Sequence, residues 1–175
     1  SERALIYAIL RRMPELSMYR KALEVAMEDY AVSAWDGWAR DWYETQVKEC
    51  DKTSGGKYLA YMLEKLSAEL NMQADGKNNI LDMIISMCKQ IKSNGYKQQN
   101  NNAVIGKLRV IFAKISLDKL EPDLVIMDEF QRFKYLINSD SDTETGMLAN
   151  KFFNSSKVRM LLLSATPYKM YSTLE

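Results

Sequence analysis

Four polar side chains follow two short apolar runs near the C-terminal end of this sequence. Asp128 and Glu129 come directly after the apolar residues 124–127, and Ser164 and Thr166 follow the apolar run 158–163. Two acids at the end of a buried strand are costly unless a cation neutralises them, and carboxylate oxygens suit Mg²⁺. A second carboxylate beside the metal can polarise an attacking water molecule. This pattern predicts a site that binds Mg²⁺ and hydrolyses a nucleotide.

The elements that would position these residues form a strand–helix–strand unit. Continuous apolarity predicts a strand at 124–127 that is buried on both faces, and a second apolar strand is expected at 158–163. The residues between them indicate helices at 130–137 and 147–152, joined by an acidic segment at 139–144. A helix between two apolar strands is typical of a parallel sheet, in which ligands bind at the carboxyl ends of the strands. The two sets of polar residues are therefore expected at the same edge.

Both segments resemble sequence motifs of a known family. Residues 124–131 (Leu-Val-Ile-Met-Asp-Glu-Phe-Gln) resemble motif II, or Walker B, of superfamily-two helicases and translocases, and residues 161–167 (Leu-Leu-Leu-Ser-Ala-Thr-Pro) resemble their motif III. The order and separation of the two motifs also match. The resemblance covers roughly residues 103–175 and is strongest to bacterial ATP-dependent helicase-like proteins of the DEAD/DEAH-like type.

The resemblance implies a role for each residue of the two motifs. Asp128 would organise Mg²⁺, Glu129 would act as the general base toward water, and Gln131 would contact the nucleotide, although many relatives carry Ala-Asp or Ala-His where this chain has Phe130-Gln131. The coupling of the nucleotide site to nucleic-acid movement would fall to Ser164, Ala165 and Thr166. The implied cofactors are ATP and Mg²⁺, and the implied partner is nucleic acid, DNA in preference to RNA.

The phosphate-binding loop of such ATPases is missing from the sequence. The motif G-x-x-x-x-G-K-[ST] supplies backbone N–H groups, a lysine and a Mg²⁺-binding hydroxyl. Gly-Lys pairs begin at positions 56, 76 and 106, but the residues that follow them are Tyr58, Asn78 and Leu108. In the family the loop precedes motif II. We therefore expect the chain to be a fragment of a longer enzyme and to be inactive by itself.

The first hundred residues show the apolar spacing of helices. Breaks at Pro14, 53–56, 75–76 and 93–95 divide them into four or five helices with short connections. The polar run 98–102 predicts a surface loop, and a further helix ends before Pro122; its expected buried side chains are Ile105, Leu108, Phe112, Ile115 and Leu120.

The fold class expected from these segments is α/β and mainly helical. Residues 1–102 would form a helical insertion or accessory subdomain, and residues 103–175 a partial RecA-like domain of the P-loop NTPase type with two parallel strands. The family's strand order would leave the second strand with a bare apolar edge. Such edges pair readily, so self-association through this edge is expected.

Composition narrows the classes of protein. The 175 residues include no histidine, which excludes Ser-His-Asp triads and the usual catalytic zinc sites. The net charge of +1 gives no global attraction to nucleic acid, and the two cysteines read as reduced core thiols. No apolar run approaches the ~18 residues that span a bilayer, and no signal peptide is visible, so a cytoplasmic protein without membrane contact is expected.

Each of these features has a simpler structural interpretation. Asp128 and Glu129 could cap the next helix, and Ser164 and Thr166 could be turn residues before Pro167. Trp35, Trp38 and Trp42 share one helical face, which is more often core or subdomain interface than a surface that stacks bases. Four basic residues could contact phosphates, but such residues more often form a solvated helix face: Lys107, Arg109, Lys114 and Lys119. On this view the chain is a helical interaction or regulatory module with vestigial ATPase motifs.

Overall fold

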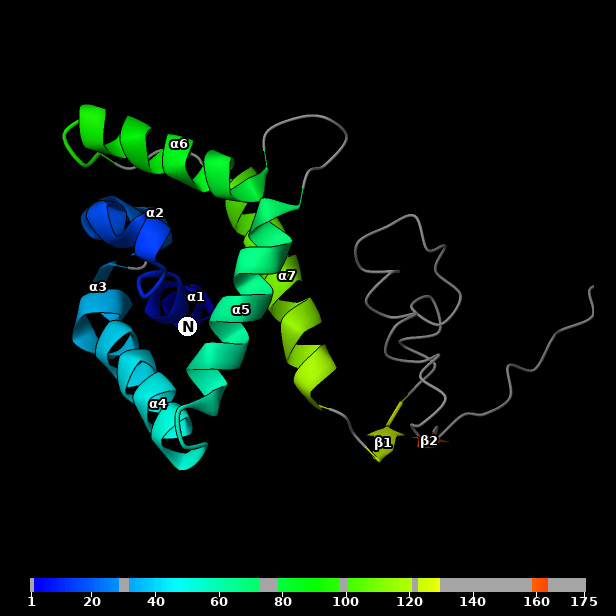
Figure 1. Ribbon diagram of the computed structural model, residues 1–175. Coiled ribbons are helices and arrows are strands. Elements are labelled where there is room, and N and C mark those ends of the chain that lie inside the picture. Colours follow the sequence, from blue (N-terminus) through cyan, green and yellow to red (C-terminus); the bar gives the residue numbers. More distant parts are fainter. Residues whose placement is uncertain are drawn as a thin grey trace, which may run out of the picture. The chain divides into compact units, whose positions relative to one another are not determined.

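The computed structural model describes residues 2–28, 32–72, 79–97, 101–120, 123–129 and 159–163 (Figure 1). The chain divides into two compact units, Ser1–Ile115 and Ser116–Glu175. The described part is mainly helical and contains a small parallel sheet of two strands, which confirms the coarse fold class. The division differs from the expected boundary after residue 102 because most of the helix that follows packs into the helical core; a RecA-like domain at 103–175 stays a prediction.

Helices account for the first unit and follow the predicted breaks. Pro14 begins a 3₁₀ helix, where its missing N–H and fixed φ are favourable. Gly55 and Gly56 take positive φ of 64° and 81° between two helices, and Gly95, with φ 70°, follows another. The helices are α1 (Glu2–Leu10), η1 (Pro14–Tyr19), α2 (Arg20–Glu28), α3 (Val32–Ala34), η2 (Trp35–Ala39), α4 (Arg40–Thr53), α5 (Lys57–Asn71), α6 (Ile80–Ser93) and α7 (Asn102–Leu120).

Side chains cap two of these helices. In the turn before α5, the Oδ1 atom of Asp51 accepts the N–H of Leu59 at 2.9 Å, and the Oγ atom of Ser54 accepts the N–H of Tyr58 at 2.9 Å. At the start of α6, the Asn79 side chain accepts the N–H of Asp82 at 2.8 Å. These bonds satisfy N–H groups that have no partner within the helix.

The core of the helical unit is apolar and centres on α1, which lies among α2, α4 and α5 (Figure 1). Side chains at helical spacing supply much of it, and the buried ones include Leu16, Tyr19, Leu23, Met27, Met62, Leu66, Leu70, Ile84, Cys88, Ile91, Ile105, Leu108, Phe112 and Ile115. No buried polar or charged residue occurs among the described residues. Burial of this kind is the main term that stabilises the unit.

The expected tryptophan face is not a core stripe. Trp35 is 4% exposed, but Trp38 and Trp42 are 54% and 49% exposed. The reason lies in η2, a π-helix in which the N–H of Arg40 bonds to the carbonyl of Trp35 five residues earlier. This wider turn changes the angle between successive side chains, so the i, i+3, i+7 spacing of an α-helix no longer places all three indoles on one side.

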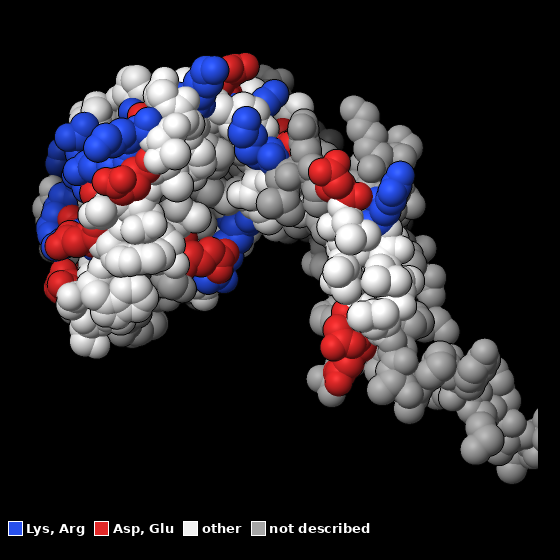
Figure 2. Space-filling model, turned by 90° about the horizontal axis from the view of Figure 1, so that it is seen from below, with Lys and Arg blue, Asp and Glu red and all other residues white. Residues whose placement is uncertain are grey.

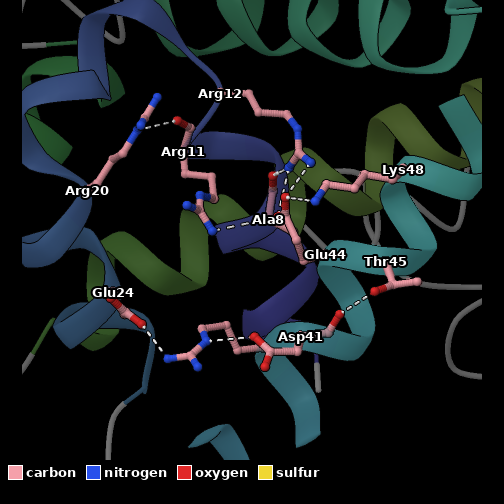
Figure 3. Close-up of polar contacts among 10 residues, drawn as sticks. Ala8, Arg11, Arg12, Arg20, Glu24, Asp41, Glu44, Thr45 and Lys48 are labelled. Atoms are coloured by element: carbon pink, nitrogen blue, oxygen red, sulfur yellow. Dashed lines mark hydrogen bonds and ion pairs between the residues drawn. The ribbon is translucent and has the colours of Figure 1, made fainter.

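Ion pairs join the helices at the surface of this unit (Figure 3). The Arg12 guanidinium donates two hydrogen bonds, of 2.7 and 3.1 Å, to the carboxylate of Glu44 in α4. It also donates a hydrogen bond to the Ala8 carbonyl. Arg40 contacts Glu24 of α2 at 3.1 Å and Asp41 at 3.0 Å. Hydrogen bonds to Asp41 and Glu24 raise the pKa of Arg40 further above its usual range. The bidentate Arg12–Glu44 pair joins the turn after α1 to α4, and the single Arg40–Glu24 bond joins α4 to α2.

Two basic residues of α7 also have acidic partners. Lys114 Nζ lies 2.6 Å from Glu69 Oε1 in α5, and Arg109 Nε lies 3.1 Å from Glu2 Oε1 in α1. These pairs favour the structural interpretation of Arg109 and Lys114 over direct phosphate contact.

Only one cysteine is a core residue: Cys88 is fully buried, whereas Cys50 is exposed. Burial raises the pKa of Cys88 from 9.0 to about 12. The buried thiol therefore contributes stability that is fully present below about pH 9 and is lost as the pH rises through about 12, because the unfolded thiol ionises first.

We expect the free energy of unfolding to fall more steeply between about pH 9 and 12 in the natural chain than in Cys88→Ala. The difference should reach a few kcal/mol, since each pKa unit is worth about 1.4 kcal/mol. Urea denaturation of both proteins across this range measures it, and lysine and tyrosine titration cancels in the comparison. Cys50→Ala should lose stability with rising pH as steeply as the natural chain. If the free energy of unfolding falls equally with pH in the natural chain and in Cys88→Ala, folding does not raise the pKa of the Cys88 thiol.

The second unit contains strands β1 (Leu124–Met127) and β2 (Arg159–Leu162), which pair in parallel as predicted. The expectation that the first strand is buried on both faces is wrong: Leu124 and Ile126 are 53% and 59% exposed. In the second strand, Leu161 is 46% exposed. A sheet of two strands has two open faces, and its side chains are buried only where further elements cover them.

Among the described residues, none of the helices combines the length and apolar character needed to cross a bilayer.

Candidate functional site

The candidate site lies where β1 and β2 end. Leu124 pairs with Arg159, and Met127 pairs with Leu162, so the strands run level with each other. The N–H of Leu163 donates to the Met127 carbonyl at 2.8 Å, which carries the ladder one residue further. Asp128 therefore leaves β1 at the edge where the described part of the second strand segment ends, at Leu163.

Asp128 is the first residue beyond β1, and its side chain is exposed. Its Oδ1 atom accepts the N–H of Glu129 at 2.8 Å, a local bond that orients the carboxylate beside the strand end. Glu129 is partly exposed and has φ 51°, in the left-handed region. Non-glycine residues enter this region at some cost, of order 1–3 kcal/mol, and such positions cluster at functional sites.

This geometry suits a hard divalent cation. Mg²⁺ keeps several water ligands and binds proteins through one or two carboxylates, which matches an exposed Asp128. Among the described residues no group of three or more His, Cys, Asp or Glu side chains could hold a metal, so the pair does not form a dedicated metal cage.

The other predicted site residues all lie in segments that the structure does not describe. Gln131, Ser164, Ala165 and Thr166 lie outside the described residues, as do the predicted helices at 130–137 and 147–152. The alternative in which Asp128 and Glu129 cap the next helix concerns that same segment and stays a prediction. Ser164 is the residue directly after Leu163, the last described residue of the second strand segment.

A second feature of the structure is a pair of exposed indoles for which the sequence predicted no function. Trp38 and Trp42 lie exposed on η2 and α4, and their ring centroids are 6.4 Å apart.

Comparison of the chain with protein-family models, with curated proteins and with solved structures gave no match.

Proposed function

We propose that the C-terminal part of the chain supplies the Mg²⁺- and water-handling segment of a nucleic-acid-dependent ATPase of the helicase or translocase class. The observation that carries the proposal is the parallel, level pairing of β1 with β2, which brings Asp128 to the sheet edge where the described second strand segment ends, at Leu163. The resemblance of both segments to motifs II and III supports it on separate grounds, because that resemblance rests on residue types and their order alone.

Each residue has a distinct task in this proposal. Asp128 holds Mg²⁺, directly or through water, and Mg²⁺ when bound neutralises phosphate charge. Glu129 accepts a proton from the attacking water, and its left-handed backbone turns the side chain out of the strand direction. Gln131 contacts the nucleotide, and Ser164 with Thr166 transmits its state to the nucleic acid.

Nucleic acid is the proposed partner, and DNA is preferred to RNA. In the helical unit, two of the basic residues that could meet phosphates, Arg109 and Lys114, contact Glu2 and Glu69 instead. On the face shown in Figure 2, basic side chains of this unit have acidic ones beside them. We therefore place most of the phosphate contact in other parts of the ATPase.

Manganese binding tests the assigned metal residue in the chain as it stands. Mn²⁺ replaces Mg²⁺ at carboxylate sites and broadens nearby NMR signals. We expect selective broadening of the amide signals of residues 127–129, and we expect Asp128→Asn to abolish it because the variant removes the charged ligand.

The matched control for this experiment is Asp123→Asn. Asp123 precedes β1, at the opposite end of the strand from Asp128, roughly 16 Å away at about 3.3 Å per residue. This variant should leave the broadening unchanged. Broadening that is absent, or that persists in Asp128→Asn, would remove the metal role from Asp128.

A second candidate function is a helical interaction module whose ATPase motifs are vestigial. The exposed Trp38 and Trp42 favour it, since large exposed apolar surfaces mark interaction sites. The two functions differ in their sequence context: a phosphate-binding loop before motif II, together with a second RecA-like domain, supports the ATPase.

Self-association through the sheet edge is a further part of the proposal. Met160, Leu161 and Leu162 are 38–46% exposed, and strand edges with exposed apolar side chains pair with other chains. We expect light scattering to show concentration-dependent dimers, and Leu161→Lys to shift the protein toward monomer. A monodisperse monomer at all concentrations would contradict this expectation.

A further inference from the structure

Three cations surround one carboxylate on the surface of the helical unit (Figure 3). Arg12 donates its two hydrogen bonds to Glu44, while Arg11 Nη1 and Lys48 Nζ lie 3.8 and 3.5 Å from oxygens of the same carboxylate. Arg20, the first residue of α2, lies beside them, because its Nε donates to the Arg11 carbonyl at 3.3 Å. We call Arg11, Arg12, Arg20 and Lys48 the basic cluster.

The fold needs only one of these cations to hold Glu44. The Arg12 guanidinium already binds both carboxylate oxygens at hydrogen-bond distance, and its side chain is 19% exposed. Arg11 and Lys48 lie beyond the usual length of such a bond, so they add positive charge without a fixed contact. Like charges at this separation repel each other, and a further anion would relieve that repulsion.

The core holds Arg11 in position for such an anion. Its guanidinium lies over the ring of Tyr7, 5.2 Å from the ring centroid, and Tyr7 is buried against Trp35. This cation–π contact restricts the guanidinium before any ligand arrives, which lowers the entropy cost of binding. Lys48, by contrast, is 66% exposed on α4 and can reach outward. The basic cluster therefore combines a positioned guanidinium with a mobile ammonium group.

The acidic residues around the basic cluster do not pair with it, apart from Glu44. Glu24 of α2 contacts Arg40 at 3.1 Å, and the Asp51 side chain accepts a backbone N–H in the turn before α5. Among the described residues, no ion pair joins Glu15 or Glu49 to a member of the basic cluster. The hydrogen bond of Arg20 goes to a carbonyl, which carries no net charge. Four cations therefore have one contacting carboxylate in the described part of the chain, an excess of three positive charges.

This excess suits a ligand that carries several negative charges. Each nucleotide of a nucleic acid carries one on its phosphate, and guanidinium groups donate paired hydrogen bonds to phosphate oxygens. Neighbouring cations from α2, α4 and the turn after α1 could contact successive phosphates of one strand. We propose that the basic cluster binds the phosphate backbone of a nucleic-acid strand. The choice of partner rests on the proposed function, and the site supplies the share of phosphate contact that the helical unit makes.

Salt dependence of binding tests the site without ATP or Mg²⁺. The probe is a fluorescently labelled oligothymidylate, titrated with the chain in EDTA at several salt concentrations and followed by fluorescence anisotropy. For single strands, the logarithm of the binding constant falls against the logarithm of salt by about 0.7 for each phosphate that a cation neutralises. Contacts from Arg11, Arg20 and Lys48 should together contribute about −2 to this slope.

Two variants should change binding in opposite directions. Lys48→Gln removes one exposed cation, so it should weaken binding by about fivefold at 0.1 M salt and make the slope less steep by about 0.7. Glu44→Gln removes the carboxylate that competes with phosphate, while the amide oxygen can still accept from Arg12. It should tighten binding by about two- to fivefold, an effect that a merely structural ion pair would not produce.

The matched control is Lys107→Gln. It changes the net charge as Lys48→Gln does, but on α7, which contributes no residue to the basic cluster, and it should leave affinity and slope unchanged. Circular dichroism at 222 nm reports that each variant is folded. Should Glu44→Gln fail to fold, the comparison of Lys48→Gln with Lys107→Gln decides by itself.

Three results would overturn the proposal. Equal weakening by Lys48→Gln and Lys107→Gln would show an effect of net charge and no site. Absence of oligothymidylate binding, or a slope that Lys48→Gln leaves unchanged, would remove the phosphate role. Tighter binding of a polyglutamate peptide than of an oligothymidylate of equal charge would make the basic cluster a docking surface for an acidic protein. None of these results bears on Asp128, whose manganese experiment uses no nucleic acid, so the two assignments fail separately.

Discussion

Glu129→Gln should abolish ATP turnover in a protein that contains this chain together with its phosphate-binding loop. The amide keeps the size of the carboxylate but cannot accept a proton from water, and loss of a general base costs about 10²–10⁴ in rate. We expect the nucleic-acid-stimulated kcat to fall by at least about a hundredfold, while the KM for ATP changes little, because the loss concerns the transition state. A coupled ATPase assay, with and without nucleic acid, measures both constants.

The control for Glu129→Gln is Asp123→Asn, which also removes one carboxylate but at the opposite end of β1. It should retain full turnover. The 175-residue chain without the loop should give no turnover above background. If the 175-residue chain hydrolyses ATP with Mg²⁺ and Glu129→Gln stops this hydrolysis, the prediction that a separate phosphate-binding loop is required is wrong. If Glu129→Gln is fully active in the loop-containing protein, Glu129 is not the general base.

Leu66→Ala should destabilise the helical unit by about 3 kcal/mol. Leu66 is fully buried in α5, and leucine-to-alanine changes in cores cost about 2–5 kcal/mol through lost burial and the cavity that remains. Chemical denaturation followed by circular dichroism at 222 nm, the helix signal, measures the change in the free energy of unfolding. The slope against denaturant should stay the same, since a cavity does not alter the surface that unfolding exposes.

The matched control is Leu124→Ala in β1, which removes the same atoms from a side chain that is 53% exposed. Its cost should stay below about 1 kcal/mol, as for most surface substitutions. Comparable losses for the two variants would mean that the strand pair is as well covered as the helical core, against the exposure of β1 and β2.

The sequence was a good guide wherever local spacing decides structure. Leu66, Leu70 and Ile84 lie at helical intervals and are buried, and the Gly55-Gly56 turn ends one helix and begins the next. The extent of β1 was predicted to the residue, and β2 lies within the predicted strand. Apolar periodicity and turn chemistry act over a few residues, so these features can be read from the chain alone.

Which side chains are buried, and which residues contact each other, depended on pairs of residues that are far apart in the sequence. An apolar run predicted a buried first strand, but Ile126 is exposed because only further elements could cover a sheet of two strands. The pairing of Arg12 with Glu44 and of Lys114 with Glu69 joins positions too far apart for any local pattern to link.

For the candidate site, the sequence by itself determined the chemistry: two acids after one apolar strand and two hydroxyl residues after another. The tertiary structure decided that the strands run parallel and level, and that Glu129 adopts a left-handed turn. It also decided that Trp38 and Trp42 face solvent. Residue types fix which reactions are available, whereas strand register depends on hydrogen bonds between segments that are far apart in the sequence. The turn at η2 closes a local hydrogen bond between residues five apart, and α-helical spacing does not show where such a turn replaces the usual one.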